Sequence, residues 1–98
     1  MSRARRPDAL ATMSDALAAG ALRALADAGL RVPADVAVTG WDDAAVARPL
    51  NLTTVAQSMR DQGAACAHQV LTGSRADFTD QWRVVERAST RPGRSIGA

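Results

Sequence analysis

The alternation of short apolar runs with longer segments of helical spacing restricts the folds open to this chain more than any other feature. Four runs have the length and composition of strands, and two segments have the caps and apolar spacing of helices. In chain order we expect a strand at 8–13, a helix at 15–28, strands at 35–40 and 52–55, a helix at 58–71 and a strand at 81–87. This order predicts an α/β fold that forms part of a doubly wound, mostly parallel sheet.

The expected helices start at residues that satisfy free backbone amides. Ser14 has the residue type of an N-cap, and Asp15 follows in the first turn, where the helix dipole favours an anion. Ser58 and Asp61 resemble a capping box at the start of the second helix, and Gly73 is a suitable stop after it.

The apolar surfaces of the two helices predict different surroundings. The helix at 15–28 has few polar side chains around its circumference, so one side should pack on the sheet and another should require a partner. That partner is a second subunit or a missing part of the same domain. The second helix has one apolar stripe, which we expect in the core with its cysteine as an inert thiol. The stripe consists of Met59, Gly63, Cys66, Ala67 and Val70.

Charge and cysteine content exclude several classes of function. The chain of 98 residues has a formal net charge of +2, but five of its twelve arginines lie near the termini. Between residues 9 and 90, seven arginines are outnumbered by nine acidic residues, so this chain alone should not read DNA. The single cysteine and the isolated His68 predict neither a metal site nor a cofactor. Without a long apolar run after the basic start, we expect a cytoplasmic protein that does not enter membranes.

Five short motifs in a fixed order resemble one known family. They are the segments 13–25 and 28–36, then Gly40-Trp41-Asp42-Asp43, Ala47-Arg48-Pro49-Leu50 and Leu52-Thr53-Thr54-Val55-x-Gln57. Together they resemble the C-terminal part of LacI/GalR-type transcriptional regulators, within the periplasmic-binding-protein-like sensor domain of type I. The resemblance runs from about residue 8 to residue 92.

This resemblance implies a domain organisation and a function. Residues 8–90 would be the C-terminal segment of a ligand-binding sensor domain, between a disordered or arbitrary start at 1–7 and a disordered tail at 91–98. The chain would sense a small-molecule effector, commonly a sugar, and would form dimers. Operator DNA would be bound only through a helix-turn-helix that this sequence does not contain. With one wall of the effector cleft, the chain alone should bind sugar weakly.

Asp42 and Gln57 are the first two candidates for contact with the effector. Asp42 follows the C-terminal end of an expected parallel strand, where open α/β sheets bind ligands, and its carboxylate can accept bonds from two vicinal hydroxyls. The resemblance places a ligand-contacting acid here, and the alternative is an ordinary loop acid. The resemblance also places Gln57 at the cleft hinge, where its amide can donate and accept. The alternative is a solvated residue before the second helix.

Three further candidates precede Asp42 in the chain. The resemblance directs Ser14 and Asp15 toward the cleft from the helix N-terminus, while the simpler interpretation is a cap and a dipole partner. Trp41 offers a flat face to sugar C–H groups, although core packing is the interpretation we favour. The expected dimer interface includes Ala19, Gly20, Arg23, Ala45 and Arg48.

Other classes of function remain open at this point. One is a fragment of an extracytoplasmic sugar-binding protein of an uptake system with the same fold. Another is a truncated gene product without a function, which would expose apolar surface and aggregate. Ser14, His68 and Asp42 can be combined into a triad on paper, but no nucleophile elbow supports it, and we do not expect an enzyme.

Overall fold

The computed structural model describes residues 5–75, 78–79 and 81–91. Its elements follow the predicted order. They are β1 (Ala9–Ala11), α1 (Asp15–Asp27), β2 (Ala37–Thr39), β3 (Thr54–Ala56), α2 (Met59–Thr72) and β4 (Arg83–Val85). The strands are shorter than expected, with three residues in each, and β3 extends one residue beyond the predicted run.

The strands form two pairs that are joined by single bridges. β1 pairs with β2 in parallel, and β3 pairs with β4 in antiparallel orientation. Parallel bridges between Thr39 and Thr53 and between Asp42 and Ala56 connect the two pairs. The predicted α/β arrangement with a partly parallel sheet is therefore confirmed.

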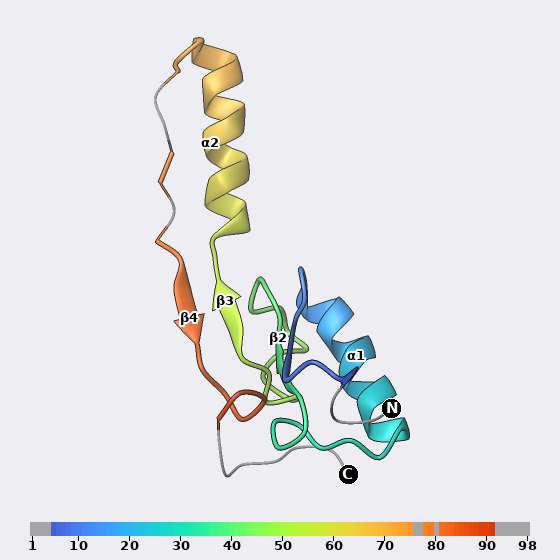
Figure 1. Cartoon of the computed structure of the whole chain (residues 1–98). Helices are drawn as coiled ribbons and strands as arrows, with labels where there is room; N and C mark the ends of the chain where they lie inside the picture. The colour runs from blue at the N-terminus through green and yellow to red at the C-terminus, as the bar shows by residue number, and fades with distance from the viewer. Residues whose placement is uncertain (1–4, 76–77, 80, 92–98) are drawn as a thin grey trace.

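The chain is elongated, with principal extents of 55 × 26 × 20 Å. Figure 1 shows α1 beside β1 and β2 in a body at one end. From this body α2 projects as an arm, with Phe78 and Trp82 beside it. The chain crosses from body to arm along β3 and comes back along β4, so these two strands connect the parts.

The small core lies between α1, β2 and the turns at 45–51. It consists of five buried side chains, with Leu22, Leu25 and Leu50 packed against them. Those five are Ala18, Val32, Val38, Ala47 and Leu52. The core is thin because α1 contributes only one fully buried apolar side chain to it.

The helix caps agree with the sequence. The Ser14 hydroxyl accepts a hydrogen bond of 3.1 Å from the Leu17 amide, and the Ser58 hydroxyl accepts one of 3.2 Å from the Asp61 amide. α2 ends at Gly73, which adopts a φ of 69° that a side chain would disfavour. Local sequence therefore determines where both helices begin.

The expected burial of α2 is wrong. No residue of this helix is buried, Met59 is 60% exposed and Val70 is 84% exposed. Cys66 is exposed and does not belong to a core. In the described part of the chain α2 projects away from the body, and Phe78 and Trp82 lie beside Cys66 without burying the stripe. Neither described helix is long and apolar enough to cross a membrane.

The first strand is exposed, although its apolar run has the composition of a buried strand. All three residues of β1 are exposed, and Leu10 retains 38% of its accessible surface. β1 pairs only with β2, so one edge and much of its surface have no neighbour within the described residues. The predicted tail at 91–98 lies outside the described residues except for Arg91.

Candidate functional site

The loop after β2 carries two consecutive aspartates with unusual backbone conformations. Asp42 has a φ of 105° and Asp43 a φ of 54°. Residues other than glycine adopt such angles at a cost on the order of 1–3 kcal/mol each, and only where the surroundings enforce them. The contacts that enforce these angles also fix where the two carboxylates lie.

Asp42 and Gln57, two of the predicted site residues, are in direct contact. The Asp42 amide donates to the Val55 carbonyl at 2.9 Å, which anchors the loop on β3. The Gln57 amide nitrogen Nε2 donates to Asp42 Oδ1. Gln62 Nε2 donates in turn to Gln57 Oε1 at 3.0 Å. Both polar atoms of the Gln57 side-chain amide therefore have a partner. The second carboxylate oxygen of Asp42 can accept from a further group.

Asp15 lies beneath this loop, with 1% of its surface exposed. Its Oδ1 accepts from the Thr54 hydroxyl at 2.7 Å, and its Oδ2 accepts from the Ala44 amide at 2.6 Å. The carboxylate thus joins α1, β3 and the loop after β2. The sequence predicted Asp15 at the helix start but not its contact with Thr54. A polar side chain in an apolar strand was the one sign that Thr54 has a buried partner.

Trp41 lies at the start of α1, next to the residue that follows the Ser14 cap. The Asp15 amide donates to the Trp41 carbonyl at 3.1 Å, which brings the helix N-terminus to the loop. The Ser14 hydroxyl serves as the N-cap, as predicted. Trp41 is half-buried and therefore not part of the buried core that we favoured. Its ring contacts Trp82 edge-on, with centroids 5.2 Å apart and an interplanar angle of 89°.

Arg87 is a polar residue of this region that the sequence did not single out. Its Nη1 lies 3.0 Å from Asp43 Oδ1 and donates to the Leu52 carbonyl at 3.0 Å. The Arg87 side chain is 14% exposed and that of Asp43 is 28% exposed. This pair could not be predicted from the sequence, because its residues are 44 positions apart and no local pattern connects a loop acid with a residue after the last strand.

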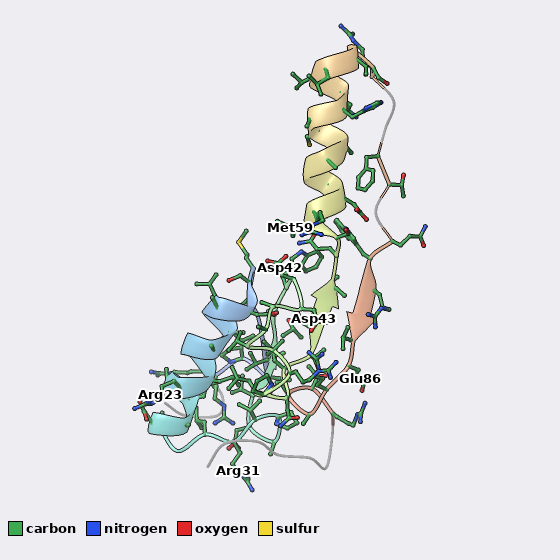
Figure 2. All side chains as sticks on the ribbon, turned by 180° about the vertical axis from the view of Figure 1, so that it is seen from behind. Arg23, Arg31, Asp42, Asp43, Met59 and Glu86 are labelled. Carbon is green, nitrogen blue, oxygen red and sulfur yellow. The ribbon has the colours of Figure 1, made fainter. Side chains whose placement is uncertain are left out.

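Two grooves adjoin the loop. One of about 520 Å³ is lined by Gln57, Ser58 and Asp61 on one side and by Phe78, Thr79, Gln81 and Arg83 on the other. The second, of about 250 Å³, is lined by Trp41 together with residues of β1, β2 and β3. Figure 2 shows Asp42 where the arm leaves the body, near Met59 at the start of α2. Among the described residues, no three His, Cys, Asp or Glu side chains form a group able to hold a metal ion.

Two of the five predicted interface residues line a groove that does not include the loop. Ala19 and Arg23 line a groove of about 460 Å³ between α1 and the segment 49–51, whose apolar lining includes Leu22 and Leu50. Figure 2 shows Arg23 toward the end of α1 that is distant from Asp42. Gly20, Ala45 and Arg48 are exposed and do not line this groove.

An open sheet with parallel strands, and a polar loop past the end of one of them, defines a ligand-binding α/β segment. Residues 1–96 match the family of the periplasmic binding protein-like domain, and the chain belongs to this family. The resemblance to LacI-type regulators is supported by the transcriptional regulator AglR of Rhizobium meliloti, which is 35% identical over 103 residues. That match covers 94% of this chain and 29% of the regulator.

Solved structures of LacI-type regulators also resemble this chain. A LacI family regulator from Lactobacillus casei with bound glucose is 36% identical, with a TM-score of 0.74. The match covers 91% of this chain and 34% of that one. The lac repressor dimer bound to operator and the anti-inducer ONPF is 32% identical, with a TM-score of 0.71, over 86% of this chain and 28% of that one. The chain thus spans about a third or less of each of these relatives, which are regulators of transcription and not enzymes.

Proposed function

We propose that this chain is the effector-sensing and dimerisation segment of a LacI-type regulator of transcription. The observation that carries the proposal is the contact between Asp42 and Gln57 past the end of β2, on a loop fixed in a disfavoured conformation. Effector binding would favour one arrangement of the sensor domain and thereby change operator affinity. DNA contact would come from a part of the regulator outside this chain, and the protein would act in the cytoplasm.

We propose a sugar as the effector. The second carboxylate oxygen of Asp42 and the polar edge of Gln57 can accept and donate to neighbouring hydroxyls, while Trp41 offers an apolar ring beside them. The Lactobacillus casei regulator with bound glucose supports this class of ligand. Ser14 would contribute from the α1 N-terminus. Asp15, also a predicted contact, would act from beneath the loop by fixing its position.

The replacement Asp42→Asn tests the sugar site. Loss of the charged acceptor should weaken glucose binding roughly 10- to 100-fold, since a hydrogen bond to a charged group contributes about 1.5–3 kcal/mol. Amide chemical shifts during a titration with concentrated glucose would measure the affinity. Asp27→Asn removes an exposed carboxylate at the far end of α1 and should leave the affinity unchanged. The proposal fails if glucose does not shift the Asp42 and Gln57 amides of the unaltered chain.

We further propose that the groove beside α1 is part of a homodimer interface. Its lining is mostly apolar, and Leu22 and Leu50 are only partly covered by the chain itself. A self-complementary surface of this kind can be buried by a second copy. The lac repressor structure, which is a dimer, supports the assignment. Gly20, Ala45 and Arg48 would lie at the rim.

The matched replacements Ala19→Arg and Ala24→Arg test this interface. Ala19 lines the groove, whereas Ala24 is an exposed residue of the same helix that does not. Arginine at residue 19 should convert the dimer to a monomer, because a cation would have to be buried against an apolar surface. Sedimentation velocity measures the change. Equal behaviour of both variants, or a monomeric unaltered chain, would contradict the assignment.

A further inference from the structure

We propose that Arg87 is a positioning residue, which orients the loop that carries Asp42 through its ion pair with Asp43. The proposal rests on the geometry of the loop. It depends on the proposed function only for the consequence that a misplaced Asp42 binds its effector less well.

The loop requires external contacts to keep its conformation. Positive φ angles at Asp42 and Asp43 are unfavourable for side chains with a Cβ, so the isolated segment would relax to other angles. Three of the contacts that oppose this relaxation come from residues before position 56. They are Asp42 N–H to Val55 O, Asp43 N–H to Thr54 Oγ1 at 3.3 Å, and Ala44 N–H to Asp15 Oδ2.

The Arg87 ion pair differs from these three contacts because it holds the Asp43 side chain and not the loop backbone. The guanidinium bridges Asp43 Oδ1 and the Leu52 carbonyl, both at 3.0 Å. It therefore connects the loop to the segment that leads into β3. A planar guanidinium with several fixed donors can serve two acceptors at once. Because the pair is mostly shielded from water, its attraction is less screened than that of a surface pair.

The backbone of Arg87 is itself held in place, so its side chain reaches the loop from a fixed position. Its amide donates to Thr53 Oγ1 at 2.8 Å, and its carbonyl accepts from the same hydroxyl at 3.0 Å. Arg91 lies four positions later and offers a contrast. It is 44% exposed and pairs with Glu86, itself 60% exposed, at 3.7 Å, so it should contribute little.

Amide hydrogen exchange tests the proposal without any ligand. In Arg87→Met, which keeps most of the aliphatic stem, we expect the Asp43 and Ala44 amides to exchange roughly 5- to 30-fold faster. The Leu22 and Leu25 amides in α1 should change much less, because the effect is local. Arg87→Lys should give intermediate rates, since an ammonium keeps the charge but has no planar fork for two acceptors. Arg91→Met serves as the matched control and should behave like the unaltered chain.

Two outcomes would overturn the proposal. One is unchanged exchange at Asp43 and Ala44 in Arg87→Met. The other is equal acceleration in α1 and in the loop, which would show that Arg87 stabilises the whole fold and not the loop. Because these measurements use no sugar, they stay valid if the Asp42→Asn titration disproves the effector site, and the two failures remain distinguishable.

Discussion

Replacing Asp15 with alanine should lower the free energy of unfolding by about 3–5 kcal/mol, because a buried hydroxyl and a partly buried amide would lose a charged acceptor. The Thr54 hydroxyl and the Ala44 amide both donate to this carboxylate, which is 1% exposed. A chain of this size is stabilised by only about 5–15 kcal/mol, and its small core suggests the lower end. We therefore expect a largely unfolded population under mild conditions.

Urea titration followed by far-UV circular dichroism measures this effect. Asp15→Asn should be intermediate, because the amide keeps one acceptor oxygen but replaces the other with a donor. Asp27→Ala in the same helix is the control. Its ion pair with Arg23 is 66–82% exposed, so the change should stay within about 0.5 kcal/mol. A cost for Asp15→Ala no larger than that of the control would show that the carboxylate does not join these elements.

Gly40→Ala should have the second largest effect, with a loss of about 3 kcal/mol from overpacking. A Cβ at this position would overlap the Asp15 carboxylate and would lie 2.9 Å from Leu52 Cδ2 and 3.2 Å from the Asp15 Cα. The last of these atoms is backbone at the start of α1 and cannot move without shifting the helix. The expected result is a lower urea midpoint together with a displaced 42–44 loop.

Gly20→Ala supplies the matched control for this substitution. Gly20 lies within α1, and a Cβ added there would meet no atom of another part of the fold within 4 Å, so alanine should stabilise the helix by roughly 0.5–1 kcal/mol. The two variants should be compared at a dilution where the chain is monomeric. Similar midpoints for both would mean that β2 and α1 are not packed as closely as the structure shows.

The burial of α2 is one prediction from the sequence that was wrong. The apolar stripe of α2 predicted a core position, yet Met59, Val70 and Cys66 are exposed. The periodicity correctly reported that the helix has an apolar side. It carried no information on what covers that side, because the partner of a helix face is chosen by distant contacts. For α1 the same kind of pattern correctly predicted a helix with apolar surface left over, as the groove beside Leu22 shows.

The sequence by itself determined the order of the elements, their caps at Ser14 and Ser58, and the position of Asp42 past the end of β2. These features depend on side chains within a few residues of one another, where propensity and hydrogen bonding act locally. Tertiary structure alone decided that Asp15 reaches Thr54 and that Arg87 reaches Asp43. Those pairs are 39 and 44 positions apart, and they form because the folded sheet brings distant segments together at one loop.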